Sequence, residues 1–255
     1  MLQQYELMTW FEFMEARDRD DLFILPIGAV EQHGPHLPMG FDLFSVYELA
    51  KQKIADRYNA VILPPLYYGY RSQTTIGGGD SYAGTIRMSG EAVCFTIRDI
   101  VMEMFRHGVK HFMILNGHLE NKIFITEGIE KAFAEYKGEI NTKVLSMEWA
   151  CYVKNETLDA IFDGNFPGWD PEHAGVLETS FMLALDPSIV RMDCLPDESA
   201  ERYIKYSVWP SRPEFVTKNG ALCPAKRSSI ANGELMMKDV LDGIFADLDY
   251  EYAQK

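Results

Sequence analysis

The residues best suited to chemistry lie between Ile24 and Asp42, where acidic and imidazole side chains follow an apolar run. Glu31 and His33 are separated by one residue, so both point to one side if the chain there is extended. Asp42 comes after a loop rich in glycine and proline and opens a helical pattern. Two carboxylates and an imidazole between a strand and a helix form a candidate metal half-site, although Glu-x-His alone is more often solvated surface.

A second pair with the same spacing, His118 and Glu120, follows the apolar run 111–115. Together the two segments offer mixed nitrogen and oxygen donors without a thiolate, a set that suits zinc or manganese. Two such ions about 3.5–4 Å apart would generate hydroxide near neutral pH and polarise a carbonyl. The candidate ligands are Glu31, His33, Asp42, His118 and Glu120.

A third segment, 165–179, combines aromatic and ionisable residues ahead of a predicted helix that extends to about Leu185. Its notable side chains are Trp169, Asp170, Glu172, His173 and Glu178. Glu178 is either a carboxylate on the helix surface or an outer partner of the metal site, and its position leaves both readings open. Trp149, which ends an earlier strand pattern, is by itself more often a core residue than part of a substrate pocket.

The composition is that of a globular protein with an acidic balance. Acidic residues outnumber basic ones by 38 to 24, giving a net charge of -14, which argues against nucleic acid or an anionic membrane surface as a partner. The four cysteines are widely and irregularly spaced, so neither a zinc ribbon nor a disulfide framework is indicated. No signal-peptide pattern and no long apolar run is visible, and we expect a cytoplasmic protein.

Helical and strand patterns alternate along the first 150 residues. This alternation predicts an α/β protein with a mainly parallel sheet and helices on both faces. Ligands of such sheets bind outside the carboxyl ends of the strands, which is where both donor pairs occur. Helices are predicted at 9–17, 42–58, 89–106, 123–136 and 232–252, and strands at 22–27, 60–63, 111–115 and from 143 to near 149.

Two stretches lack regular patterns. The loop 67–84 interleaves tyrosines with glycines, and it either covers the site or forms an interface. The stretch 187–230 carries scattered aromatic residues and prolines, and we interpret it as an arm that packs on the body or on another subunit.

Three motifs taken together resemble one known family. EQHGPHLP with Asp42, NGHLEN and WDPEHAGVLETS, in this order and spacing, are similar to those of the creatininase (creatinine amidohydrolase) family. The resemblance includes YYGYRSQ and the glycines after it, and it is weakest between Asp197 and Ser229. It implies a three-layer α/β/α fold, a single metallohydrolase domain over residues 1–255 with an irregular arm at about 187–230, and a homohexamer.

The resemblance also implies two divalent ions per subunit. Carried over by position, Glu31, Asp42 and His118 hold one ion, which is often manganese in the family. His33, Asp42 and Glu120 hold the other ion, zinc, so that Asp42 bridges the two.

Substrate-handling residues follow from the same comparison. Glu172 and His173 match residues near the scissile bond, with His173 placed to move a proton. Leu119 stands where creatininase itself has a tyrosine close to the substrate, which leaves the substrate open. The implied substrate-binding residues are Trp149, Trp169, Asp170 and Leu119.

The leading hypothesis is therefore a metal-dependent hydrolase that opens a small cyclic amide, with creatinine converted to creatine as the first reaction to test. The alternative keeps the metals and cleaves a carbon–carbon bond in a diketo-inositol, as an inosose hydrolase of the family does. A third hypothesis is a non-catalytic metal-binding or assembly protein, and the predicted open coordination and the Glu172–His173 pair argue against it.

Overall fold

The computed structural model describes residues 3–73, 78–202, 204, 206–210 and 212–253. The chain forms two compact units, which are described separately. Unit 1 comprises Met1–Val30, Asp42–Tyr70 and Ile86–Glu148, and unit 2 comprises Glu31–Phe41, Arg71–Thr85 and Trp149–Lys255. In the described part of the chain, no helix combines the length and apolar character needed to cross a bilayer.

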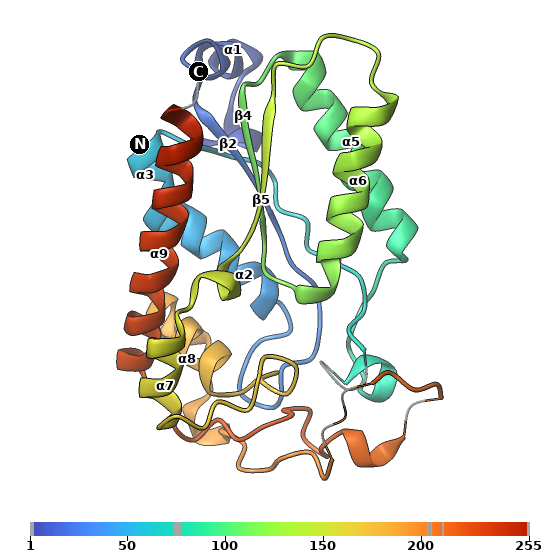
Figure 1. Ribbon diagram of the computed structural model, residues 1–255, viewed down its shortest axis with the longest axis vertical. Coiled ribbons are helices and arrows are strands. Elements are labelled where there is room, and N and C mark those ends of the chain that lie inside the picture. The colour runs from blue at the N-terminus through green and yellow to red at the C-terminus, as the bar shows by residue number, and fades with distance from the viewer. Residues whose placement is uncertain (1–2, 74–77, 203, 205, 211, 254–255) are drawn as a thin grey trace. The chain divides into compact units, whose positions relative to one another are not determined.

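Unit 1 is built on a parallel sheet (Figure 1). Within the described residues its strands run in the order β1-β3-β2-β4-β5, and every pairing is parallel, which confirms the predicted sheet type. Ile27 of β2 is in register with Asn116 of β4, so these neighbouring strands end at the same edge. The strands are β1 (Gln3–Gln4), β2 (Leu22–Ile27), β3 (Val61–Ile62), β4 (His111–Asn116) and β5 (Lys143–Glu148).

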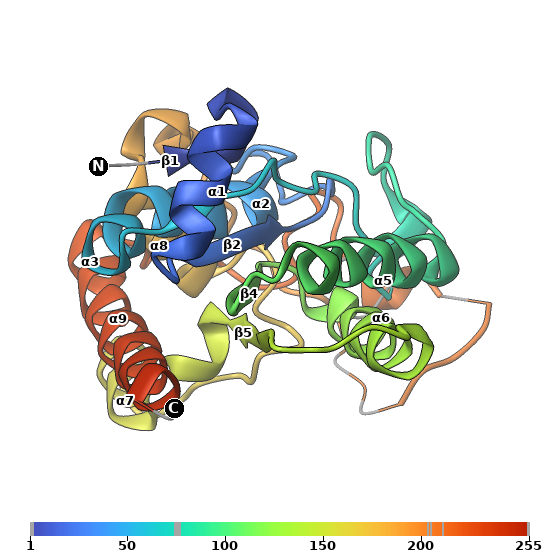
Figure 2. The ribbon, with the colours of Figure 1, turned by 90° about the horizontal axis from the view of Figure 1, so that it is seen from above.

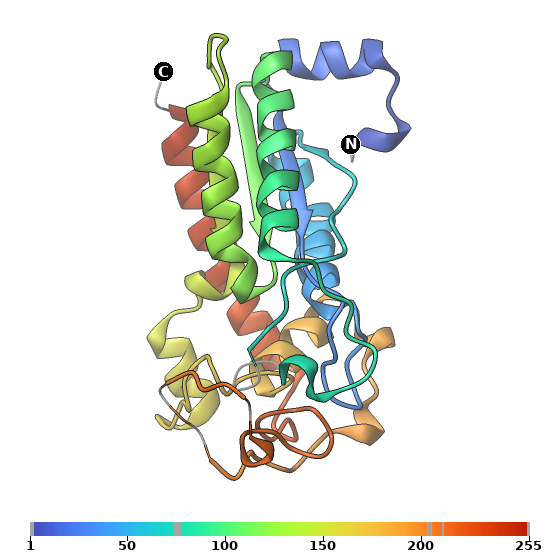
Figure 3. The same ribbon diagram turned by 90° about the vertical axis from the view of Figure 1, so that its right-hand side faces the viewer.

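Helices cover both faces of this sheet. Figures 2 and 3 show α5 and α6 side by side on one face, with α2 and α3 on the other. The predicted helix 42–58 is present, but a π-helical segment, Ala50–Ile54, divides it into α2 and α3. The bounds are α1 (Trp10–Asp18), α2 (Phe41–Leu49), α3 (Ala55–Tyr58), α5 (Gly90–His107) and α6 (Lys122–Glu135).

Local sequence signals set several helix ends in unit 1. The Thr9 side chain accepts from the Glu12 N–H while Glu12 binds the Thr9 N–H, a reciprocal capping box that begins α1. The Ser89 side chain accepts from the Ala92 N–H and so caps the start of α5, and Gly108 ends α5 with φ 70°, a left-handed conformation that favours glycine. The predicted helices 9–17 and 89–106 begin at these capping residues.

The main apolar core of unit 1 lies between the sheet and helices α5 and α6. Alternate strand residues such as Phe23 and Phe112 are completely buried there, and each contributes roughly 1.5–3 kcal/mol by leaving water. Phe13 of α1 packs edge-on against Phe23, with ring centroids 5.6 Å apart. The core therefore fixes the position of β2 and β4, whose ends carry the candidate ligands.

Unit 2 is mainly helical. The helices α7 (Asn155–Phe162) and α8 (Val176–Leu185) pack on the long C-terminal helix α9 (Ile230–Ala253) (Figure 1). A Cβ at Gly233 would lie 1.9 Å from the Ser180 carbonyl oxygen, so glycine is required where α9 crosses α8. The short helix α7 was not predicted from the sequence. Unit 2 also holds the loop 67–84 from Arg71 onward. Residues 74–77 of this loop lie outside the described residues.

Short 3₁₀ turns complete both units. They are Tyr5–Leu7 and Leu119–Asn121 in unit 1, and Gly79–Ser81, Trp149–Tyr152, Pro187–Ile189, Met192–Cys194 and Pro213–Phe215 in unit 2. The predicted arm, 187–230, contains three of them and no longer helix or strand within its described residues. This matches the absence of a regular pattern in its sequence.

Candidate metal centre

Two glycines allow the strand ends of unit 1 to press against the first turn of α2, where Asp42 lies. A Cβ at Gly28 would be 2.3 Å from the Leu43 nitrogen, and one at Gly117 would be 1.9 Å from the Asp42 carbonyl oxygen. No larger residue tolerates such contacts. Backbone packing therefore fixes the position of Asp42 relative to the ends of β2 and β4.

The asparagines of NGHLEN shape the turn after β4. Asn116 donates to the His118 carbonyl at 2.7 Å and accepts from the His118 N–H at 3.2 Å. Asn121 is completely buried, accepts from the Tyr70 N–H at 2.8 Å and donates to the Gly28 carbonyl at 2.9 Å. Sequence reasoning assigned no role to either asparagine, although both flank the predicted ligands within the same motif.

Buried Asp42 and His118 and partly buried Glu120 lie near this turn, and we call these three residues the strand-end cluster. The His118 Nδ1 lies 3.0 Å from Asp42 Oδ2, and its Nε2 lies 3.6 Å from Glu120 Oε2. His118 Nε2 donates to the Tyr70 carbonyl at 2.8 Å. Since a carbonyl only accepts, it holds the hydrogen on Nε2 and directs Nδ1 toward Asp42, the usual arrangement of a metal-binding histidine.

A second group lies in unit 2, and we call Glu31, His33 and His173 the loop cluster. Their candidate donor atoms all lie within 4.8 Å of one another, and all three residues are buried. His33 Nδ1 donates to the Glu31 carbonyl at 3.1 Å, which leaves Nε2 for other partners. The ring centroids of His33 and His173 are 4.4 Å apart.

Two further contacts surround the loop cluster. The Ser72 hydroxyl donates to the Glu31 carboxylate. Glu178 Oε2 accepts from the Ala174 N–H at 2.6 Å and lies 3.8 Å from His33 Nε2. Glu178 therefore supports the backbone before α8 and also faces a candidate ligand, and its role as an outer partner of a metal site stays a prediction.

The donor sets of both clusters fit divalent cations. Burying a carboxylate away from water is costly unless a positive group compensates it, and both clusters combine such carboxylates with neutral donors. Two donors that each lie about 2.0–2.2 Å from one ion are about 3 Å apart, and the Asp42–His118 distance is 3.0 Å. This donor chemistry is the reason that we treat the residues of both clusters as candidate metal ligands.

Glu172 is buried beneath the start of α8. Its carboxylate accepts from the Leu177 N–H and lies 2.8 Å from Cys223 Sγ, which donates to it. Burial raises the pKa of Glu172 to about 7, and burial together with the neighbouring Glu172 raises the pKa of the Cys223 thiol well above its ordinary value. These contacts direct Glu172 toward the helix N-terminus, where a negative charge is favourable.

The predicted aromatic residues occupy different environments. Trp149 is buried and stacks on Phe181, with ring centroids 4.3 Å apart and an interplanar angle of 9°. It meets Trp169 edge-on at 6.1 Å. Trp169 is half-buried and Asp170 is exposed. Trp149 is therefore a buried residue of unit 2, and it also contacts a second indole.

Leu119 and His36 are also resolved. Leu119 lies in unit 1 with 47% of its surface exposed, between the candidate ligands His118 and Glu120. His36 is completely buried in unit 2, and its Nε2 lies 2.7 Å from the Thr179 hydroxyl. Burial, with the neighbouring His33 charge, lowers the pKa of His36 to about 4, so this imidazole is neutral and structural.

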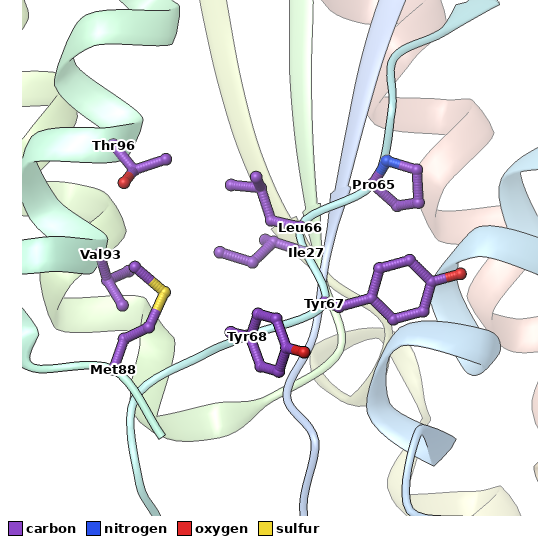
Figure 4. Close-up of a pocket in the computed structure, with 8 residues that line it drawn as sticks. All are labelled: Ile27, Pro65, Leu66, Tyr67, Tyr68, Met88, Val93 and Thr96. Atoms are coloured by element: carbon purple, nitrogen blue, oxygen red, sulfur yellow. The ribbon is translucent and has the colours of Figure 1, made fainter. Parts of the chain in front are cut away.

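A separate apolar pocket of about 270 Å³ opens in unit 1 (Figure 4). It lies between the strand end at Ile27 and the start of α5. Within the described residues its lining has no carboxylate, imidazole or thiol, so it offers no metal ligand. It is lined by Ile27, Pro65, Leu66, Tyr67, Tyr68, Met88, Val93 and Thr96.

Comparison with known proteins covers the whole chain. The family model described as "Creatininase: Creatinine amidohydrolase" matches residues 6–248. A creatinine amidohydrolase of Pseudomonas putida is 38% identical over 242 residues, covering 93% of this chain and 92% of that protein. A 3-dehydro-scyllo-inosose hydrolase of Thermotoga maritima is 27% identical over 201 residues, covering 78% of this chain and 61% of that protein.

Solved structures agree with this similarity. A creatininase variant complexed with creatine superposes with a TM-score of 0.93 at 35% identity, covering 99% of both chains. A manganese form and a variant of Zn–Zn type each have a TM-score of 0.92 at 36% identity, covering at least 98% of each chain. The chain has a parallel α/β sheet, carries the three motifs in order, and matches the family model over nearly its full length. It therefore belongs to the creatininase family.

Proposed function

We propose that this chain is a creatinine amidohydrolase that opens the ring of creatinine to give creatine. The observation that carries the proposal is 38% identity over 93% of the chain to the Pseudomonas enzyme, with 92% of that enzyme covered. The candidate site residues come from three separate motifs, and a match of this length spans all three. We also propose that both units act as one metallohydrolase domain.

The proposed centre holds two divalent ions, zinc and manganese. Glu31, Asp42 and His118 would hold one ion, and His33 and Glu120 would join Asp42 around the other. The support is the donor chemistry of the strand-end and loop clusters together with the manganese and Zn–Zn forms of similar creatininases. Bound ions would supply hydroxide near neutral pH and polarise the amide carbonyl.

The remaining site residues would bind the ring and move protons. A water oxygen adds to the ring carbonyl carbon, the carbon–nitrogen bond breaks, and the ring nitrogen receives a proton. His173 is the proposed donor of that proton. Trp149, Trp169 and Asp170 would hold the flat ring, and Glu172 would fix the start of α8 next to His173.

The test is turnover by metal-reconstituted protein with creatinine and a panel of other cyclic amides. We expect hydrolysis of creatinine, loss of activity after chelation, and recovery with Zn²⁺ or Mn²⁺. A diketo-inositol serves as the comparison substrate, because the inosose hydrolase is the more distant relative at 27% identity. Absence of creatinine hydrolysis by protein with two ions bound would contradict the proposal.

We further propose a homohexamer in the cytoplasm. Exposed apolar side chains on unit 1, among them Trp10, Phe11 and Tyr68, are of the kind that subunit contacts cover. The four cysteines are free, which suits a reducing compartment. Light scattering coupled to size exclusion should give six times the chain mass of 29.1 kDa, and a monomer mass at assay concentration would refute the hexamer.

A further inference from the structure

Gln32 lies between two predicted ligands, Glu31 and His33, and its own side chain is buried in unit 2. Its Oε1 accepts from the Gly34 N–H at 3.0 Å, and its Nε2 donates to the Gly220 carbonyl at 3.0 Å. A backbone N–H only donates and a carbonyl only accepts, so these two partners fix which end of the amide is oxygen. The orientation of the Gln32 amide is therefore determined.

The fixed amide faces one nitrogen of His173. Gln32 Nε2 lies 3.0 Å from His173 Nε2, and the Gln32 backbone carbonyl oxygen lies 2.8 Å from the same atom. One residue thus presents a donor and an acceptor to this nitrogen. If Nε2 carries hydrogen it donates to the carbonyl, and if it does not it accepts from the amide. In either tautomer Gln32 holds the imidazole from the Nε2 side.

The other end of this contact is a turn of the arm, residues 217–222. Gly220 has φ 94°, and a Cβ there would lie 1.9 Å from Gln32 Oε1, so the turn closes directly on the amide. The turn is itself fixed, since the Gly220 N–H donates to Thr217 Oγ1 at 3.1 Å. The Leu222 N–H donates to the His173 carbonyl at 3.0 Å. The turn therefore holds both His173 and the residue that orients it.

We propose that Gln32 is a positioning residue that sets the orientation of the His173 imidazole, with the 217–222 turn as its support. The proposal rests on the role given to His173 in the proposed function, and it assigns part of the arm a task within the site. Gln32 acts through His173, not on the substrate. Its removal should therefore lower kcat and leave metal binding and KM nearly unchanged.

Gln32→Met keeps the length of the side chain and removes both polar ends, and Gln32→Glu keeps the acceptor toward Gly34 and removes the donors. For each variant we expect kcat to fall about 10- to 100-fold, the usual effect of losing such a supporting contact, with the metal content of wild type. Gln52→Met is the matched control, because Gln52 is exposed in unit 1. Unchanged kcat in both Gln32 variants would overturn the proposal.

A double-mutant cycle separates positioning from general damage. In a His173→Ala background, Gln32→Met should change the residual kcat less than about 2-fold, because its route of action is already removed. A fall as large as in the wild-type background would show that Gln32 acts elsewhere. If His173→Ala itself retained full activity, the role of His173 in the proposed function would fail, and that result differs from failure of Gln32→Met alone.

A spectroscopic readout does not depend on turnover. The ¹⁵N resonances of the His173 ring in metal-free protein report its tautomer and hydrogen bonds, and His173→Ala identifies them. We expect Gln32→Met to shift these resonances and Gln52→Met to leave them in place. Identical His173 resonances in Gln32→Met and wild type would overturn the proposal even if the substrate proved to be different.

Discussion

The strand-end cluster and the loop cluster contain the same kinds of donors but are positioned by different means. In the strand-end cluster, backbone atoms press together at Gly28 and Gly117, and the Tyr70 carbonyl orients His118. In the loop cluster, polar contacts from the loops orient the imidazoles: the Glu31 carbonyl accepts from His33, and the Gln32 side-chain amide lies against His173. One cluster is a property of the sheet edge, and the other depends on polar contacts among loops and α8.

This difference predicts how each cluster responds to change. A cluster fixed by backbone packing should lose its metal only when a ligand itself is removed. The loop cluster is held by polar contacts among loops, so substitution of a residue that touches neither metal nor substrate should also lower its function. The expected effects below run from the largest to the smallest.

His118→Ala should have the largest effect, since it removes a ligand that the backbone already orients. Losing several kcal/mol of transition-state stabilisation corresponds to a fall of more than about 1,000-fold in kcat/KM. Metal content measured by mass spectrometry should fall by one ion per subunit. His111→Ala is the control, because His111 begins the strand that His118 follows, and it should retain both metal and activity. Full metal occupancy in His118→Ala would remove His118 from the ligand set.

His173→Ala tests the loop cluster. If His173 moves a proton, kcat should fall about 100- to 10,000-fold while both ions stay bound. His107→Ala, at the end of α5, is the matched control and should be close to wild type. Loss of an ion from His173→Ala would make this residue a ligand, as its grouping with Glu31 and His33 also permits.

The strand-end cluster could be predicted from sequence, and the loop cluster only in part. His118 and Glu120 follow an apolar run, and parallel strands place their ends at one edge, so pattern and topology suffice for that pair. The contact between Gln32 and His173 joins residues 141 positions apart through irregular segments, which no periodicity reveals. His173 was noted among the ionisable residues of 165–179, its role came from the resemblance, and Gln32 was not found at all.

The same reasoning applies to the fold. The helices 9–17 and 89–106 and the buried strands were predicted because their signals are local, and the Thr9 and Ser89 caps are found where those predicted helices begin. The helix α7 was missed because it has no side-chain cap and spans only Asn155–Phe162. Its burial depends on packing against α9, which is a tertiary effect. The role of Glu172 as support for α8 likewise appears only once α8 is placed.

Glu172→Gln should sharpen the comparison through pH. Burial raises the pKa of Glu172 from 4.5 to about 7 in the folded protein. Its contribution to stability is therefore fully present below pH 4.5 and is lost as the pH rises through about 7. The amide of the variant cannot ionise. The unfolding free energy of Glu172→Gln minus that of wild type should therefore rise by on the order of 1 kcal/mol per pH unit across that window.

The measurement is urea unfolding of metal-free protein at several pH values. Glu156→Gln, at an exposed carboxyl of α7, should show no such pH-dependent difference from wild type. Parallel stability curves for Glu172→Gln and wild type would mean that Glu172 is not the group that ionises in this window.

Leu119→Tyr should have the smallest effect. Leu119 is exposed between the candidate ligands His118 and Glu120, so a change there should affect substrate contact without changing the metal content. A tyrosine could add one aromatic contact to a flat ring, about 0.5–1.5 kcal/mol, or roughly a 2- to 10-fold lower KM for creatinine. Ile123→Tyr, exposed on α6, is the control and should leave KM unchanged. A fall in kcat with metal loss in Leu119→Tyr would show instead that the strand-end cluster is sensitive to side chains, and the contrast between the clusters would not hold.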